Sequence, residues 1–112
     1  MEVYFQLITD AESLKKACAE LANEDYLGFD TETTALDPFD GYIRLVQLSN
    51  GRETIVIDLK PFMEIGKLGE LPELQPLREL LNAPKPIKIA HNAKFDAKWT
   101  KHHLGTDLNG IF

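Results

Sequence analysis

The sequence predicts an α/β domain, and three observations support this prediction. Short apolar runs typical of buried strands alternate along the chain with segments whose apolar residues recur at helical spacings of three and four. Asn50-Gly51 lies between two strand-like runs and predicts a β-hairpin, whose strands are antiparallel neighbours. The length of 112 residues leaves room for one domain.

The charge balance argues against some classes of function. Lys and Arg number 12 and Asp and Glu 18, so the formal net charge is −6. Strong nucleic-acid binders usually carry a basic surface, and this composition argues against a protein that binds polyanions in bulk. An enzyme that meets phosphates through metal ions is compatible with it, because an acidic metal site adds negative charge.

The chain carries a single cysteine, Cys18, so it has no disulfide framework and a reducing compartment is indicated. No apolar run approaches the roughly 18 residues that span a membrane, and the N-terminus lacks the signal-peptide pattern. We therefore expect a cytoplasmic protein with no membrane partner.

The first elements are a strand and a helix. Residues 3–8 form a short strand-like run, and Thr9 with Glu12 fits a capping box that begins a helix. The apolar positions of that helix share one face, which places Cys18 in the core: Leu14, Ala17, Cys18 and Leu21. Residues 23–25 end the helix, and a central strand begins directly at residue 26.

After the central strand 26–31, a loop at 33–41 leads into the hairpin strands 42–49 and 53–58. The Asn-Gly pair between them predicts a type I′ turn, in which both central residues have positive φ. Asp58 ends the second hairpin strand and is interpreted as a turn residue in preference to a metal ligand.

The second half begins with an irregular segment, 59–71, followed by a helix that ends before Pro84 and has an apolar face of Leu74, Leu77, Leu80 and Leu81. Residues 87–90 form a buried strand. Asn92 is the expected N-cap of a helix over 93–102, and residues 106–112 open a further strand.

Asp30 and Glu32 stand at the end of the central strand. Side chains two apart on a strand point to the same face, so the two carboxylates project together. Like charges raise each other's pKa unless a cation lies between them, and hard oxygen ligands suit Mg²⁺ or Mn²⁺ better than zinc or copper. The alternative is an ordinary solvent-facing strand end.

Asp96 lies four residues after Asn92, on the same helix face. It is in position to face Asp30 and Glu32 if the strands 26–31 and 87–90 are neighbours. Phe95 and Trp99 are interpreted as core anchors. The histidines His91, His102 and His103 match no zinc-ligand spacing and are interpreted as surface or strand-end residues.

Two stretches carry a resemblance to a known family. LGFDTETTALDP resembles the first motif of the DEDD 3′–5′ exonuclease superfamily, and IKIAHNAKFDAKW resembles its second, with Asn92 and Asp96 on the expected positions. The nearest branches are those of ribonuclease D and the proofreading domain of DNA polymerase I. The resemblance covers essentially the whole chain and implies a ribonuclease H-like fold, a mixed β-sheet with flanking helices.

The resemblance also implies an activity. The family hydrolyses single-stranded DNA or RNA from the 3′ end to nucleoside monophosphates, using two divalent cations, Mg²⁺ or Mn²⁺. On the matching positions Asp30 would bridge both ions, Glu32 would hold the ion on the nucleophile side and Asp96 the ion on the leaving-group side. The implied contacts to the terminal nucleotide are Thr33, Thr34 and Asn92, and Leu36 would pack against or wedge beside the terminal bases. For Leu36 the alternative is a side chain that tucks the loop onto the domain.

The chain departs from the family pattern in one respect. The third motif, with a fourth acidic ligand preceded by a Tyr or His, does not occur in residues 1–112, so we expect a partial domain that is incomplete at its C-terminus. Alone it would be weakly active or inactive. It would also leave an apolar sheet face uncovered, which favours a homo-oligomer or a complementing chain. The alternative function is a catalytically inactive module that binds nucleic acid or protein.

Overall fold

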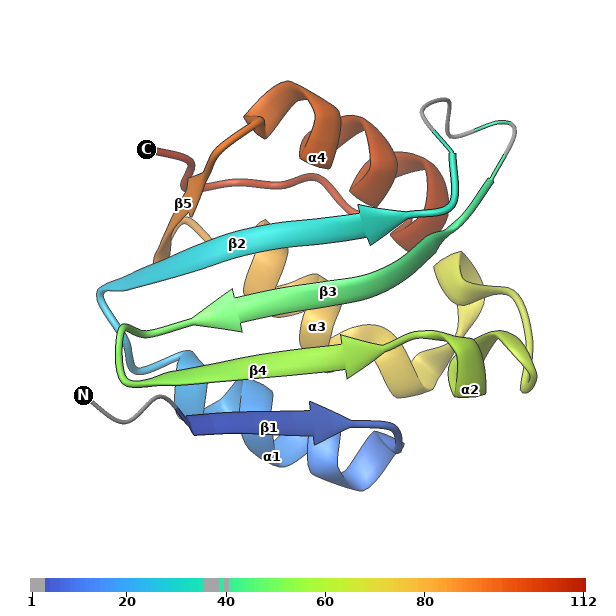
Figure 1. Cartoon of the computed structure of the whole chain (residues 1–112), viewed down its shortest axis with the longest axis horizontal. Helices are drawn as coiled ribbons and strands as arrows, with labels where there is room; N and C mark the ends of the chain where they lie inside the picture. Colours follow the sequence, from blue (N-terminus) through green and yellow to red (C-terminus); the bar gives the residue numbers. More distant parts are fainter. Residues whose placement is uncertain (1–3, 36–38, 40) are drawn as a thin grey trace.

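Five strands form one mixed sheet in the spatial order β1-β4-β3-β2-β5 (Figure 1). The computed structural model describes residues 4–35, 39 and 41–112. The strands are β1 (Tyr4–Ile8), β2 (Tyr26–Thr33), β3 (Ile43–Ser49), β4 (Glu53–Asp58) and β5 (Ile87–Ala90). β1 pairs in parallel with β4, and β5 in parallel with β2, while β2, β3 and β4 are joined antiparallel. The predicted α/β fold with a mixed sheet is therefore confirmed.

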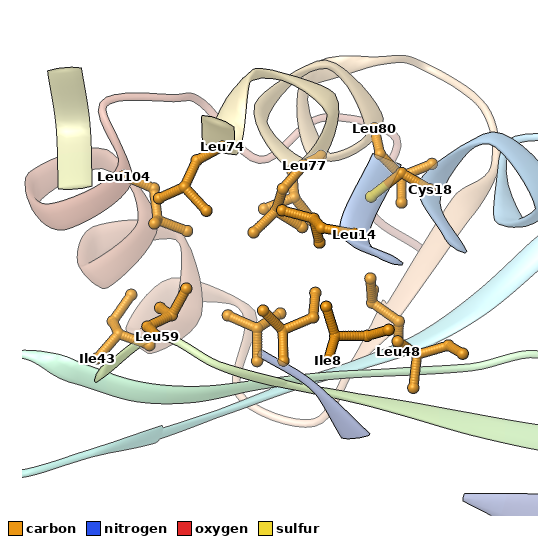
Figure 2. Packing of buried hydrophobic residues seen from close by; sticks show 14 of the residues in the cluster. Ile8, Leu14, Cys18, Ile43, Leu48, Leu59, Leu74, Leu77, Leu80 and Leu104 are labelled. Carbon is orange, nitrogen blue, oxygen red and sulfur yellow. The ribbon is translucent and has the colours of Figure 1, made fainter. Parts of the chain in front are cut away.

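The helices pack against one face of this sheet. They are α1 (Ala11–Leu21), α2 (Lys60–Met63), α3 (Gln75–Asn82) and α4 (Ala93–Trp99), the last continued by a π-helical turn, Thr100–Leu104. Helix α3 passes behind the strands in Figure 1, and Figure 2 shows the apolar side chains that fill the space between helices and strands. Buried leucines and isoleucines dominate this core.

The predicted core positions are confirmed except for Phe95, which is only partly buried. All four apolar positions of α1 are buried, including Cys18 at 5% exposed, and burial raises the pKa of its thiol to about 12. On α3 the buried residues are Leu77, Leu80 and Leu81, and Leu74, predicted on the same helix face, is buried in the 3-10 turn Pro72–Leu74 just before α3. Trp99 is fully buried, whereas Phe95 is half-buried and packs against the edge of the core. The burial of Trp99 anchors α4 in the core.

The start of α1 differs from the prediction. Asp10, not Thr9, is the N-cap, because its carboxylate accepts hydrogen bonds from the Ser13 amide at 2.8 Å and the Ser13 hydroxyl at 3.0 Å. An Asp at this position satisfies a free amide of the first turn and lies favourably near the positive end of the helix dipole. The predicted capping box of Thr9 and Glu12 is therefore wrong, and the N-cap lies one residue later than expected.

The β3–β4 hairpin is confirmed, but its turn is not type I′. Gly51 has a φ of 90°, and no residue other than glycine has positive φ within the described ranges, so Asn50 lacks the required conformation. The side-chain oxygen of Asn50 instead accepts hydrogen bonds from the amides of Arg52 and Glu53, each at 2.9 Å. The turn is therefore closed by the Asn side chain, a common use of this residue.

Three smaller segments also differ from or refine the prediction. The segment 59–71 contains the short helix α2 and a 3-10 turn, Leu68–Glu70, so it is more regular than expected. Asp58 accepts hydrogen bonds from Arg44 Nε at 3.1 Å and the Lys60 amide at 3.0 Å, which confirms its role as a turn residue. In place of a strand over 106–112, a single parallel bridge joins Ile111 to Lys88.

The other face of the sheet, which we call the open face, carries no helix formed by the described residues (Figure 1). Large apolar side chains on it are exposed, among them Phe5 at 71%, Leu7 at 63% and Ile89 at 49%. An uncovered apolar face was expected. A homo-oligomer or a complementing chain over this face stays a prediction. None of the described helices is long and apolar enough to cross a membrane.

Candidate active site

Strand β2 supplies the first two candidate ligands. Burial alternates along it, with Leu27, Phe29 and Thr31 buried toward the helices and Asp30 and Glu32 exposed. The sheet register places Asp30 opposite Gln47 of β3, and Glu32 opposite Leu45. Because directly paired residues share a face of the sheet, both carboxylates lie on the open face.

The local structure explains why these carboxylates are accessible. Pairing between β2 and β5 stops at Phe29 and Ala90, so Asp30 lies just beyond the carboxyl end of the parallel pair. The register with β3 shifts between Glu32 and Thr33, which marks the end of regular pairing on the other side. Ligand sites of α/β sheets commonly lie at the carboxyl ends of parallel strands.

Helix α4 brings the third carboxylate to the same place from the helix side. The helix begins directly after β5, where the Asn92 side chain accepts a hydrogen bond from the Phe95 amide at 3.4 Å and confirms the predicted N-cap. Asp96 is 3% exposed, and its Oδ1 accepts a hydrogen bond of 2.7 Å from the Thr31 hydroxyl. Thr31 therefore fixes Asp96 to the strand that carries Asp30 and Glu32.

Asp30 and Asp96 both accept hydrogen bonds from Thr31, and the charge of Asp30 affects the pKa of Asp96. Burial raises the pKa of the Asp96 carboxyl above its usual range, the Thr31 hydrogen bond opposes this, and the negative charge of Asp30 adds to the increase. Asp30 in turn accepts a hydrogen bond from the Thr31 amide at 3.0 Å. The two acids thus lie on either side of Thr31, and a cation near them would relieve their repulsion.

The donor set suits a hard divalent ion, because carboxylate oxygens are the preferred protein ligands of Mg²⁺ and Mn²⁺. Within the described ranges, however, no three His, Cys, Asp or Glu side chains come together closely enough to hold an ion as a group. The structure links Asp30 to Asp96 through Thr31, whereas Glu32 shares only the exposed face of Asp30. Among the described residues, no hydrogen bond or ion pair links Glu32 to Asp96.

The two threonines expected to contact substrate are engaged within their own loop. The Thr33 hydroxyl donates to the Ala35 carbonyl at 2.8 Å, and the Thr34 hydroxyl accepts from the Tyr42 amide at 3.0 Å. Gly41 is required here, because a Cβ at this position would lie 2.5 Å from Thr34 Oγ1. These bonds close the base of the loop beside the carboxylates. Leu36 lies outside the described residues.

A hollow on the open face lies beside Asp30. The residues that line it come from β2, β3, β4, β5 and the segment directly after β5, and include Gly28, Asp30, Gln47, Ser49, Ile89 and His91. Of these, only Asp30 was singled out as a site residue from the sequence. Thr31 was also missed as a functional residue, although its position between two acids on an alternating strand was a usable signal.

The fold and the acidic end of β2 together define a nuclease-like α/β domain, and comparison with known proteins gives the family. The chain belongs to the 3′–5′ exonuclease family, whose model matches residues 5–112. Over 95 residues it is 41% identical to DNA polymerase I of Aquifex aeolicus. The aligned region covers 85% of this chain and 14% of the polymerase. The predicted family is thereby confirmed.

Solved structures show the same fold. The ribonuclease D of Trypanosoma brucei in complex with RNA U12 superimposes with a TM-score of 0.79 at 17% identity, covering 98% of this chain and 37% of that one. NrnC of Brucella melitensis, solved with bound Mg²⁺, gives a TM-score of 0.71 at 25% identity, covering 100% of this chain and 49% of that one. The ribonuclease H-like fold is confirmed, and the chain spans less than half the length of these relatives.

Proposed function

We propose that the chain is the catalytic part of a metal-dependent 3′–5′ exonuclease that removes nucleoside monophosphates from the 3′ end of single-stranded DNA or RNA. The observation that carries the proposal is the 2.7 Å bond between Thr31 and Asp96, since it joins the acidic helix residue to the acidic strand end. Membership of the exonuclease family supports the same reaction.

In this proposal Asp30, Glu32 and Asp96 hold two divalent cations, Mg²⁺ or Mn²⁺. Bound ions of this kind lower the pKa of an attacking water and stabilise the leaving oxygen of a phosphodiester. Thr31 orients both acids, through its hydroxyl to Asp96 and its amide to Asp30. From the family resemblance we carry over contacts of Asn92, Thr33 and Thr34 to the terminal nucleotide, and packing of Leu36 beside the terminal bases.

The relatives support the choice of ion and substrate. The Brucella protein was solved with Mg²⁺ and the Trypanosoma protein with RNA, and the Aquifex relative is a DNA polymerase. We therefore propose that hydrolysis by this chain also depends on a divalent ion. Both DNA and RNA are candidate substrates, and the test compares them. A catalytically inactive binding module is not favoured, because the candidate site keeps all three acidic residues of the two motifs.

Ion binding is the primary test. Calorimetry with Mn²⁺ should show binding by the wild type that Asp30→Asn abolishes and Asp96→Asn weakens. Asp25→Asn, which removes an exposed carboxylate before the start of β2, is the matched control and should bind as the wild type. Equal Mn²⁺ binding by the wild type and Asp30→Asn would contradict the assigned site.

Hydrolysis is the second test. A 5′-labelled single strand, supplied as DNA and as RNA of the same sequence, should lose 3′ nucleotides stepwise in Mn²⁺ but not in chelator. Because three acidic ligands are assigned and the resemblance implies four, we expect weak trimming by residues 1–112, increased by a segment that carries the third motif. Trimming that persists unchanged in Asp30→Ala would assign the activity to a contaminant.

A further inference from the structure

The outer surface of α4 is positively charged in a chain whose net charge is −6. Residues 91–105 contain three lysines, three histidines and one acid, Asp96, which is buried toward the sheet. Lys94, Lys98 and Lys101 follow one another at spacings of four and three, so they share one side of the helical segment. All three are exposed.

Little in the described part of the chain neutralises these charges. Lys94 and Lys98 form no ion pair with any described residue. Lys101 lies 3.1 Å from Asp107, but the two side chains are 67% and 63% exposed, and exposed pairs of this kind are weak. The ammonium groups are therefore available to an anionic partner.

Aromatic rings lie directly beside the lysines. Phe39, which is 77% exposed, meets His102 edge-on with ring centroids 4.5 Å apart. His102 contacts His103 at 4.7 Å, and His103 stacks on the fully buried Trp99 at 5.0 Å. The exposed rings are thus connected to the core through a series of ring contacts, which holds them in place.

Phe39, Lys98, Lys101 and His102 line one hollow on this surface. We call these four residues the α4 surface. Aromatic faces that stack on bases, next to ammonium groups that contact phosphates, are the combination by which proteins bind single-stranded nucleic acid without reading its sequence. An acidic peptide would use the lysines but would have no need of the exposed ring.

We propose that the α4 surface binds single-stranded nucleic acid, with a base stacked on Phe39 and His102 and phosphates on Lys98 and Lys101. This proposal rests on the proposed exonuclease function. The α4 surface would contact a part of the substrate strand away from its 3′ end. The α4 helix connects the two regions, since it carries Asp96 toward the sheet and the lysines toward solvent.

The test is fluorescence anisotropy of a labelled single-stranded oligonucleotide in chelator, at several salt concentrations. Each phosphate contact on a single strand contributes about 0.7 to the slope of log K against log salt, so Lys98→Ala with Lys101→Ala should lower the slope by about 1.4. Phe39→Ala should weaken binding by roughly 5- to 150-fold, as expected for one stacked base, without changing the slope.

The matched control removes two exposed lysines from another helix. Lys15→Ala with Lys16→Ala changes the net charge equally on α1 and should leave affinity and slope as in the wild type. An equal loss of affinity in this control would assign the effect to bulk charge and overturn the proposal. Unchanged, wild-type affinity of the Lys98 and Lys101 double variant would also overturn it. Tighter binding of polyglutamate than of the oligonucleotide would assign the surface to an acidic protein partner.

The readouts separate this inference from the proposed function. Asp30→Asn should lose Mn²⁺ binding yet keep oligonucleotide binding in chelator, whereas the lysine double variant should keep Mn²⁺ binding. If Mn²⁺ binding and trimming fail but the lysine-dependent slope remains, only the exonuclease assignment is wrong. If trimming succeeds and the slope is unchanged by the lysines, only the α4 surface is wrong.

Discussion

The two faces of the sheet differ sharply, although alternate residues of the same strands form both. On β2, Leu27 is fully buried under the helices, whereas Asp30 faces the open side. The exposed Leu7 of β1 lies on the same face, because the strand pairings connect it to Asp30 across β4 and β3. The helix side contains closely packed aliphatic and aromatic residues, whereas the open side mixes acids with uncovered apolar groups. Stability and candidate chemistry can therefore be changed separately by substituting neighbouring positions.

Asp96 is the exception to this division. It comes from the helix layer and is buried, yet it interacts with Thr31 and Asp30 at the site. A buried carboxylate lowers the stability of the fold unless a partner compensates it. The comparison thus predicts that the packed side determines folding, the open side determines binding, and Asp96 contributes to both with opposite signs.

The largest expected effect comes from the packed side. Leu27→Ala removes a fully buried side chain and should lower the free energy of unfolding by about 2–5 kcal/mol, through lost burial and a residual cavity. Leu7→Ala is the matched control, because this leucine is 63% exposed, and it should change stability by no more than about 0.5 kcal/mol. Urea denaturation measures both, and similar losses would show that the open face is covered in solution.

The packed side also depends on one polar group, Arg78. Its guanidinium donates to the Leu68 carbonyl at 2.6 Å, the Leu71 carbonyl at 2.7 Å and the Leu104 carbonyl at 2.8 Å, so it joins three segments. Arg78→Lys keeps the charge but loses the planar fork, and should lower stability by about 1.5–3 kcal/mol.

Arg52→Lys is the control for this prediction. Arg52 pairs with Glu24 at 3.2 Å, its side chain is 77% exposed, and the change should cost less than about 1 kcal/mol. Equal unfolding midpoints for the two variants would mean that the three carbonyls find other partners when the guanidinium is absent.

Sequence patterns predicted the elements well because periodicity is a local property. The buried face of α1, the β3–β4 hairpin and the exposed pair Asp30 and Glu32 all follow from spacing along the chain. Details decided by competition between neighbouring groups were missed. Asp10 replaces Thr9 as the cap because its carboxylate reaches Ser13, and the Asn50 side chain closes its turn without a positive φ.

The site was predictable only in part, because its assembly depends on long-range contacts. The motifs located Asp30 and Asp96, but the hydrogen bond that joins β2 to α4 links Thr31 and Asp96, residues 65 positions apart in the chain. The parallel pairing of β2 with β5 that makes this bond possible is equally invisible to local spacing. The ring contacts from Phe39 to Trp99 also required the folded chain.

A smaller effect of opposite sign is expected at Asp96. In chelator, Asp96→Asn should raise the melting temperature, because a neutral amide replaces a buried carboxylate whose pKa is already raised, and its oxygen still accepts the Thr31 bond. The same variant should lose trimming activity. Asp30→Asn, at an exposed position, should change the melting temperature less. A lower melting temperature for Asp96→Asn would show that the charged form stabilises the fold.

The smallest effect at neutral pH is expected at Lys88, a fully buried residue of β5 whose ammonium donates to the Ala83 carbonyl at 2.6 Å. Burial lowers the pKa of Lys88 from its ordinary value of 10.5 to about 8. Between these two values the unfolded chain binds more protons than the folded one, so the free energy of unfolding should rise with pH through this window. Lys88→Met should remove that rise. At pH 7 the substitution should change the free energy of unfolding little, because the lost hydrogen bond lowers it and the removal of a buried charge raises it.

Urea midpoints from pH 7 to 10.5 measure the difference between wild type and variant, with Lys16→Met as an exposed control that keeps the wild-type profile. A parallel course for wild type and Lys88→Met would show that this lysine keeps an ordinary pKa, and that the packed face of β5 tolerates its charge.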